Sequence, residues 1–182
     1  MNKNYLIALT IAAAIALLVS SPAAQAAPGE LERAQAAYFR GDYVEAMMRF
    51  QPLAEDGDAH ATFLIGYMYE KGQGVPQDDE QAAEWYGRAA ALGNPFAQNN
   101  LGVLHKYGRG VPKDLVQSYK WFDLAASGYL PAESGHKESA ILNQQDIAAE
   151  MTPREIQEAQ RLAETFRDEN DKGPRYVPPR VR

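Results

Sequence analysis

Apolar side chains recur at intervals of three and four residues along the middle of the chain, a spacing that places them on one face of a helix. One stripe consists of Ala61, Ile65, Met68 and Tyr69. The next consists of Ala82, Trp85, Tyr86, Ala89 and Ala90. Between the stripes lie Gly72, which suits a left-handed helix C-cap, and Gly74-Val75-Pro76, where proline cannot continue a helix. The pattern predicts two helices joined by a short turn.

The same pattern occurs again 36 residues further along the chain. When residues 58–92 are laid onto residues 94–128, 11 of the 35 pairs are identical. The identities fall on turn residues, one aromatic position and small side chains, namely Ala61/Ala97, Gly66/Gly102, Gly72/Gly108, Gly74/Gly110, Val75/Val111, Pro76/Pro112, Asp78/Asp114, Gln81/Gln117, Trp85/Trp121, Ala89/Ala125 and Ala90/Ala126. The chain therefore contains an internal repeat, with predicted helical pairs at 58–93 and 94–128.

Each repeat also signals where its second helix begins. Asp78 and Asp114 are favoured N-cap residues, and Gln81 and Gln117 follow three positions later, as in a capping box. The second helices are therefore predicted to begin directly after the two aspartates.

Two glycines, Gly66 and Gly102, lie inside the first helix of each repeat. Glycine there costs about 0.8–1.0 kcal/mol relative to alanine, so a packing gain must offset it. We expect close helix–helix approach, with the rings of Trp85 and Trp121 lying over the missing side chains. Both tryptophans are then predicted to be buried in one shared spine.

Further helices are predicted on both sides of the repeats. Residues 30–56 contain a helical pair with its turn at Gly41, and the string AYFRGDYVEAMMRF within it resembles a tetratricopeptide hairpin. Residues 130–171 begin like a third repeat but lose the Gly-x-Gly-Val turn and the tryptophan, as expected of a terminal unit. Thr152-Pro153 is a typical start for a last, capping helix.

The first 26 residues have the order of a secretory signal peptide. Lys3 is followed by an uncharged, largely apolar run over 5–19, and Ala24-Gln25-Ala26 is a small-x-small cleavage site. The alternative is a retained membrane anchor, but a bilayer core needs about 20 apolar residues. We expect cleavage after Ala26, a periplasmic or secreted protein, and no stable membrane insertion afterwards.

Charge is divided unevenly along the chain. Residues 27–171 carry 24 acidic and 13 basic residues, a net charge of −11, while residues 172–182 (KGPRYVPPRVR) carry four basic residues and no acid. Proline and glycine content predicts a disordered tail over 172–182. The tail is either solvated without a role, or contacts anionic envelope surfaces or the acidic body itself. The total charge of −6 argues against nucleic acid as a partner.

No motif for catalysis, metal binding or cofactor binding occurs in the chain. It has no cysteine, which excludes disulfides, thiolate metal sites and a cysteine nucleophile. His60, His105 and His136 do not have the spacing of metal ligands, and His105 takes the position of Tyr69 in the other repeat. The acidic run at 78–80 is explained by the helix dipole. We therefore predict no catalytic residue, no metal and no cofactor.

The strings LIGYMYEKGQGVPQDDEQAAEWYGRAAALG (64–93) and NLGVLHKYGRGVPKDLVQSYKWFDLAASG (100–128) resemble Sel1-like repeats, an α-solenoid family related to tetratricopeptide repeats. Ile65 stands where leucine is usual, and His105 where tyrosine is usual. The resemblance implies a right-handed superhelix of antiparallel helix pairs and a role as an adaptor for other proteins. Secreted members credited with β-lactamase or penicillin-binding activity resemble a cysteine-rich branch, so that activity does not carry over to this cysteine-free chain.

The resemblance also implies that the first helices stack along a concave surface. Phe63, Tyr67 and Lys71 form a line along one first helix, because they are four residues apart. Asn99, Val103 and Tyr107 form the corresponding line in the next repeat. With Gln98 beside them, these residues predict an aromatic groove with a polar rim that binds a protein or peptide segment. The alternative is that the rings pack against neighbouring repeats or the N-terminal hairpin.

The sequence thus favours an exported, non-catalytic scaffold that holds a peptide or protein segment in its concave groove, in assembly or maintenance of the cell envelope. Two alternatives stay open. One is a hydrolase of cell-wall or β-lactam substrates. The other is a regulatory adaptor tethered to the inner membrane by an uncleaved signal.

Overall fold

The computed structural model describes residues 29–170. Within them there is no strand, and the helices are α2 (Glu30–Arg40), α3 (Tyr43–Glu55), α4 (Ala59–Lys71), α5 (Asp79–Ala91), α6 (Pro95–Tyr107), α7 (Leu115–Gly128), the 3-10 turn η2 (Pro131–Glu133), α8 (Ser134–Ala148) and α9 (Pro153–Asn170). The predicted all-α solenoid class is confirmed. The predicted signal peptide at 1–26 and the predicted tail at 172–182 lie outside the described residues.

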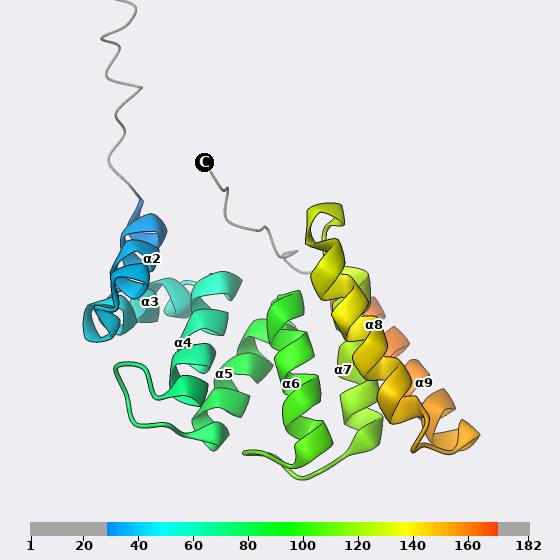
Figure 1. Ribbon diagram of the computed structural model, residues 1–182. Helices are drawn as coiled ribbons and strands as arrows, with labels where there is room; N and C mark the ends of the chain where they lie inside the picture. Colours follow the sequence, from blue (N-terminus) through cyan, green and yellow to red (C-terminus); the bar gives the residue numbers. More distant parts are fainter. Residues whose placement is uncertain (1–28, 171–182) are drawn as a thin grey trace, which may run out of the picture.

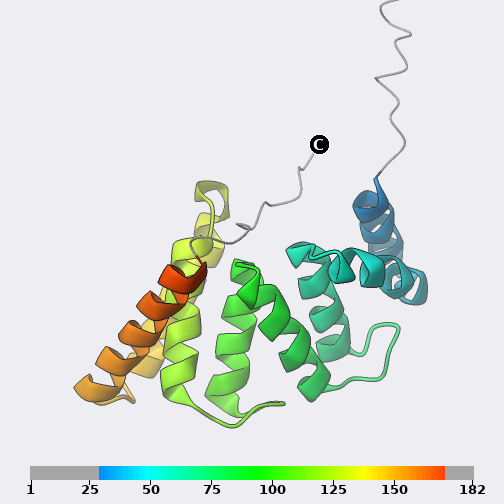
Figure 2. The same ribbon diagram turned by 180° about the vertical axis from the view of Figure 1, so that it is seen from behind.

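The helices stack as a curved row in two layers. Figure 1 shows α4, α6 and α8 in front, with α5, α7 and α9 behind them. Figure 2, seen from behind, brings α9 and α7 to the front. From α2 to α8 each helix packs on the next one in sequence, as in a solenoid, whereas α9 returns to pack on α7. Among the described residues, no helix is long and apolar enough to cross a membrane.

The 36-residue register extends into the N-terminal hairpin. The second helices α3, α5 and α7 begin at residues 43, 79 and 115. A Cβ atom on Gly74 would lie 2.8 Å from the backbone of Tyr43, and one on Gly110 would lie 2.0 Å from the carbonyl oxygen of Asp79. Each turn glycine therefore packs on the first residue of the preceding second helix. The N-terminal hairpin takes the place of a preceding repeat, although its own turn is shorter.

The caps of the repeats form as their residue types indicate. The carboxylate of Asp78 accepts hydrogen bonds from the backbone N–H groups of Glu80 and Gln81, and that of Asp114 accepts one from Gln117. These contacts satisfy backbone donors that a helix leaves unpaired at its start. The predicted N-caps of α5 and α7 are confirmed.

The prediction that the two tryptophan rings lie over Gly66 and Gly102 is wrong, although Trp121 is buried as predicted. Gly66 faces the ring of Tyr86, where a Cβ atom would lie 2.8 Å from Cδ1, and Gly102 faces Phe122, where it would lie 2.8 Å from Cε1. Consecutive residues of a helix point about 100° apart, so only the ring after each tryptophan reaches the glycine. Trp121 is buried between the repeats, whereas Trp85 is half-buried against the α2–α4 cluster. The two indoles therefore do not share one spine.

The C-terminal helix covers the end of the second repeat. At its start the N–H of Thr152 donates to the carboxylate of Glu155 at 2.7 Å, and the N–H of Glu155 donates to Thr152 Oγ1 at 3.3 Å. This reciprocal capping box fixes where α9 begins. Further along, the ring of Phe166 lies edge-on to Trp121, with 5.3 Å between ring centroids. Helix α9 thus shields the apolar side of α7 from water.

Candidate protein-interaction face

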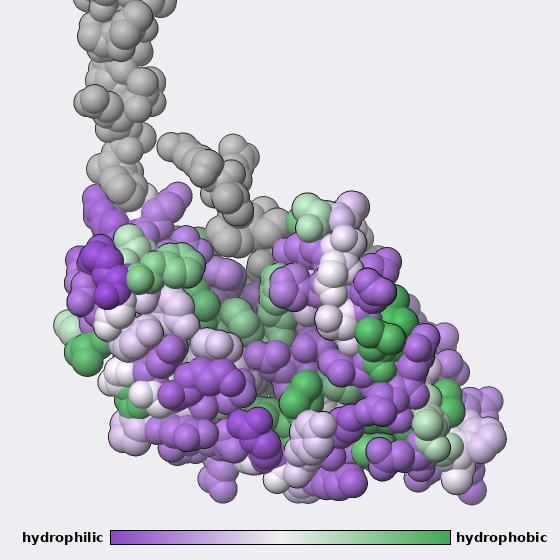
Figure 3. Space-filling model, viewed as in Figure 1, coloured by the Kyte–Doolittle hydropathy of each residue, from purple (hydrophilic) through white to green (hydrophobic). Residues whose placement is uncertain are grey.

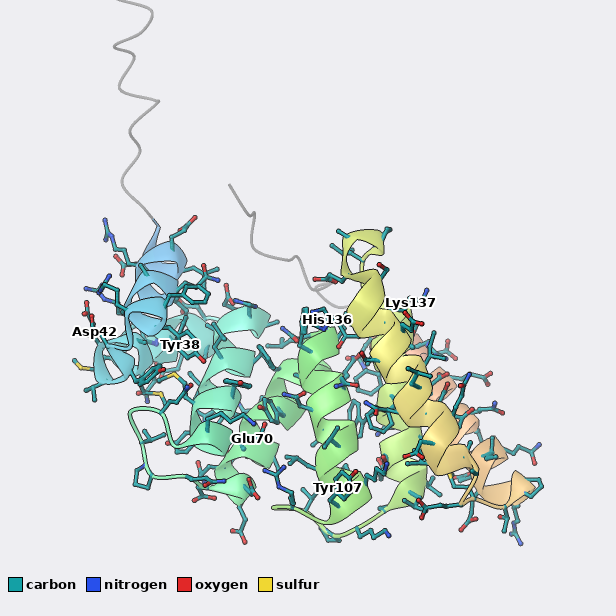
Figure 4. All side chains as sticks on the ribbon, viewed as in Figure 1. Tyr38, Asp42, Glu70, Tyr107, His136 and Lys137 are labelled. Carbon is teal, nitrogen blue, oxygen red and sulfur yellow. The ribbon has the colours of Figure 1, made fainter. Side chains whose placement is uncertain are left out.

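Aromatic rings from successive hairpins meet on the face formed by α4, α6 and α8, which we call the front face. Ring centroids of Phe63 and Phe96 are 5.9 Å apart, and those of Phe63 and Tyr67 are 6.3 Å apart. Phe96 also lies 5.0 Å from His136 and 5.1 Å from Tyr129, both edge-on. Figure 4 shows His136 beside the upper end of α6. We call these five residues the aromatic row.

The front face is hollowed at its centre. In the space-filling view of Figure 3, hydrophobic surface lies in this hollow and hydrophilic surface surrounds it. Phe63, Tyr67 and Phe96 are half-buried, so part of each ring remains accessible to solvent. Partly accessible rings with a polar surround are suited to hold apolar side chains of another protein.

A small pocket lies between α4 and α6 on this face. Its volume is about 130 Å³, which suits one side chain, and it is lined by Tyr67, Glu70, Lys71, Asn100, Val103 and Leu104. Because both helices contribute residues, neither repeat forms the pocket by itself. We call it the α4–α6 pocket.

Glu70 provides the negative charge in this pocket, and its side chain is only 11% exposed. The hydroxyl of Tyr86 donates to it at 2.7 Å, and Lys71 Nζ donates at 2.8 Å. Burial works to raise the pKa of Glu70, but these hydrogen bonds and the charges of Lys71 and Arg109 outweigh it, so the pKa lies below its usual value. The carboxylate is therefore ionised at neutral pH.

Four of the sequence-predicted groove residues come together around this pocket. Phe63 and Tyr67 belong to the aromatic row, and Lys71 Nζ lies 5.3 Å from the centroid of the Tyr67 ring. Val103 lines the pocket opposite, on α6. Phe63 also stacks on Tyr86, with 5.8 Å between centroids, so the rings pack on neighbouring helices as well. Their role in binding stays a prediction.

The other three predicted residues are placed elsewhere. Asn99 Oδ1 accepts a hydrogen bond from Asn143 Nδ2 at 3.3 Å, which joins α6 to α8. Tyr107 is 62% exposed at the far end of α6 (Figure 4). Gln98 is only 4% exposed, and its Nε2 donates to the carbonyl of Ala90 at 3.2 Å. Its predicted place on the groove is wrong, because one helical step turns its side chain away from that of Asn99.

Sequence reasoning missed most of the aromatic row. Phe96 is at the same repeat position as His60, so both repeats have a ring at the start of the first helix. This shared feature could have indicated Phe96. His136 and Tyr129 lie in the degenerate third unit, where the repeat no longer indicates equivalent positions. Glu70 was missed because the equivalent position in the next repeat is Lys106. The two repeats therefore show no common charge at this position.

The two histidines within first helices are poor proton acceptors. His60 Nδ1 is buried without a hydrogen-bond partner among the described residues, and burial lowers its pKa despite the nearby charge of Asp58. Burial also lowers the pKa of His105, although the carbonyl of Pro112 and the charge of Asp114 work in the opposite direction. Over residues 29–170, no group of three or more histidine and acidic side chains could hold a metal ion.

Helical hairpins stacked at a fixed period, with first helices forming one face, define a helical-repeat protein. Residues 59–94 and 95–129 each match the Sel1 repeat. A Sel1 repeat protein from Oxalobacter formigenes is similar in structure, with 32% identity and a TM-score of 0.51, over 60% of this chain and 86% of that one. The chain belongs to the Sel1 repeat family.

Two further relatives are longer proteins. The antigen c5321 of uropathogenic Escherichia coli, which displays an SLR fold, has 29% identity and a TM-score of 0.67, over 77% of this chain and 30% of that one. DAP3-binding cell death enhancer 1 of Rattus norvegicus is 38% identical over 60 residues, which are 33% of this chain and 12% of the rat protein. The chain thus spans less than a third of either relative. Sel1 repeat proteins are generally non-catalytic protein-interaction modules.

Proposed function

We propose that this protein is exported and binds an extended segment of a partner protein on its front face, without catalysing a reaction, in assembly or maintenance of the cell envelope. The observation that carries the proposal is the aromatic row beside the α4–α6 pocket. The ring centroid of Phe63 lies 5.9 Å from that of Phe96 and 6.3 Å from that of Tyr67, and all three residues are only half-buried. Such rings supply contact area with few rotatable bonds to immobilise.

The pocket adds selectivity to this surface. A space of about 130 Å³ admits one side chain at a fixed place along a bound segment. At the pocket Lys71 is exposed and Asn100 belongs to the lining, so polar groups are available to a partner's backbone. Asn99 and Asn143 add polar groups further along the front face, between α6 and α8. Apolar contacts on the rings and polar contacts at the edge together favour an extended segment.

The α4–α6 pocket can be tested by site-specific photocrosslinking in the producing bacterium. A photoreactive amino acid at Lys71 is expected to capture a partner, whereas the same group at Glu84, exposed on α5, is not. Affinity for the partner segment is then measured with Tyr67→Ala, which is expected to weaken binding at least tenfold, or about 1.4 kcal/mol. Met48→Ala, which truncates an exposed apolar side chain on α3 away from the pocket, is the control. Equal crosslinking at both positions, or equal affinity of both variants, contradicts the proposal.

Export rests on residues 1–26, and N-terminal sequencing of the protein recovered from the periplasmic fraction tests it. We expect a start at Ala27. A product that retains residues 1–26 and sediments with membranes would instead support the tethered adaptor. Hydrolase activity is tested separately, by incubating the purified protein with a chromogenic β-lactam and with peptidoglycan, and we expect no turnover above that of buffer.

A further inference from the structure

A second pocket lies in the back layer. Its volume is about 510 Å³, and it forms where the turn between α5 and α6 meets the ends of α7 and α9. Its lining includes Gly93, Gln98, Leu124, Gly128, Phe166 and Asp168. Figure 2 shows the end of α9 on this side of the molecule. We call it the α9 pocket.

The α9 pocket contains a buried acceptor without a donor. Gln98 is 4% exposed, and its Nε2 donates a hydrogen bond to the carbonyl oxygen of Ala90. Its Oε1 has no hydrogen-bond partner within residues 29–170. That oxygen lies 3.7 Å from where a Cβ atom on Gly128 would be, and both residues line the pocket. An unpaired buried amide oxygen costs about 1–3 kcal/mol, which favours occupation by an N–H donor.

The rest of the pocket is suited to an apolar, positively charged segment. Leu124 and Phe166 supply apolar walls, and Asp168 supplies a negative charge at the rim. Arg167 also lines the pocket, but its guanidinium is paired with the carboxylate of Asp123. Gly128 lets α7 approach α6 closely beside Gln98, because a Cβ atom there would lie 3.2 Å from Cβ of Pro95. A ligand that fits therefore combines an apolar side chain, a backbone N–H and a nearby basic group.

The chain itself carries such a segment directly after the pocket. Helix α9 ends at Asn170, which lines the pocket, and the sequence continues DKGPRYVPPRVR. Gly173-Pro174 is a turn-forming pair that allows the chain to reverse. Tyr176 is six residues beyond Asn170, which gives a reach of about 20 Å. The segment Tyr176-Val177 offers an apolar surface and N–H donors, with Arg175 next to it.

We propose that residues 171–182 fold back on the same molecule, place Tyr176 and Val177 in the α9 pocket, and donate a backbone N–H to Gln98 Oε1. Arg175 then lies near Asp168. Docking would link the end of α9 to α6 and α7, and it is independent of partner binding on the front face. Of the contacts considered for the basic tail, this one is favoured over an anionic envelope surface, because the pocket offers both the unpaired acceptor and the apolar walls.

Cysteine pairs test the proposal cleanly, because the chain has no cysteine of its own. The protein is purified from cells that express the whole chain, with Val177→Cys combined with Ser127→Cys at the pocket rim. The matched control combines Val177→Cys with Glu164→Cys, which is exposed on α9 but does not line this pocket. Glu164 is nearer to Val177 along the chain, so an undocked tail would favour the control pair. We expect the Ser127 pair to form its disulfide at least tenfold faster.

Equal rates, or a faster control pair, overturn the proposal, and they are the result expected if the tail is solvated or prefers an anionic surface. Disulfide-linked dimers as the main product also overturn it, since they place the tail on a second copy. Gln98→Met removes the acceptor at similar volume and is expected to reduce the rate advantage to under threefold. Should that variant unfold by circular dichroism, Tyr176→Ser/Arg175→Glu in the tail gives the same test without altering a helix. A rate advantage unchanged in the folded variant contradicts the proposal.

Discussion

Arg109 donates two hydrogen bonds to the carboxylate of Asp79, at 2.9 and 3.0 Å, across 30 residues of sequence. The contact joins the turn of the second repeat to the first residue of α5, next to the place where Gly110 packs on Asp79. One repeat earlier, Gln73 is in the position of Arg109 and hydrogen-bonds with the hydroxyl of Tyr43 at 3.3 Å. Equivalent positions thus make the contact at both junctions, as an ion pair in one and as a hydrogen bond between uncharged side chains in the other.

The Arg109–Asp79 pair should contribute measurably to stability. Both side chains are about one-third exposed, so solvent weakens the interaction, but the paired geometry favours it. A double-mutant cycle with Arg109→Gln and Asp79→Asn, measured by urea denaturation, is expected to give a coupling energy of about 1 kcal/mol. The exposed pair Glu158–Arg161 on α9 is the control, and a smaller coupling is expected there because both side chains lie in solvent. Equal couplings would show that the junction pair adds nothing to a surface contact.

Two glycines within helices should respond oppositely to alanine. Gly102→Ala places a Cβ atom 2.8 Å from the ring of Phe122, and overpacking of this kind costs about 1–3 kcal/mol. Gly87→Ala on α5 meets nothing within 4 Å and gains helix propensity of about 0.5–1 kcal/mol. Urea denaturation should show the first variant less stable than the parent and the second more stable. Stabilisation by both changes would contradict close packing at Gly102.

Asn94 connects the two repeats, and replacing it by aspartate should be costly. Its Nδ2 donates to the carbonyl of Ala59 at 3.2 Å, while its Oδ1 accepts from the N–H of Ala97 at 3.0 Å. Aspartate can still accept the hydrogen bond from Ala97 N–H, but it places a carboxylate opposite the buried carbonyl of Ala59. We therefore expect the free energy of unfolding to fall by about 2–3 kcal/mol, measured by thermal or urea denaturation. Asp58→Asn, the reverse exchange at the cap of α4, should change stability by under about 0.5 kcal/mol. Similar losses for both would refute a role for the Ala59 contact.

Stability should fall as the pH is lowered from about 7.5 to 5.5. The pKa values of His60 and His105 lie below the ordinary 6.5 because of burial, so the unfolded chain binds protons more strongly than the folded one in this range. Glu70 has the opposite consequence at lower pH: its depressed pKa adds stability that is present above about 4.5 and lost as the pH falls further.

The measurement is the urea midpoint across pH 7.5–5.5 for the parent and three single variants. His60→Gln and His105→Gln should each flatten the decline, because each removes one group that gains a proton on unfolding. Gln157→Ala, at an exposed residue on α9 that does not titrate, is the control and should leave the decline as it is. An unchanged decline in all three variants would assign the pH dependence to other groups.

Local signals in the sequence were sufficient for the register of the fold. Gly72, Asp78 and Asp114 act on the backbone within a few residues, through a left-handed cap or a hydrogen bond to an N–H group. Such effects do not depend on the rest of the molecule. The packing of the tryptophans could not be predicted in this way. An apolar stripe indicates which face of a helix is buried, but not which neighbouring residue covers each position. The ring of Tyr86, and not the indole of Trp85, lies over Gly66, and the packing of α4 on α5 determines that.

In the candidate site, too, contacts within one helix could be predicted from the sequence, and contacts between helices could not. Phe63, Tyr67 and Lys71 could be predicted as a line because they lie on one helix, where spacing alone fixes their alignment. Phe96 and His136 could not, because their contact joins α6 to α8 and depends on how far each helix is displaced along its neighbour.

The sequence by itself determined where helices begin and end and how far apart the repeats are, since caps, turns and periodicity are properties of short stretches of chain. The tertiary structure alone decided which rings meet on the front face, that Gln98 lines a pocket behind it, and that Arg109 reaches Asp79. Those contacts join residues 30 or more positions apart, or different faces of one helix, and their free energy depends on side chains that no single stretch of sequence contains.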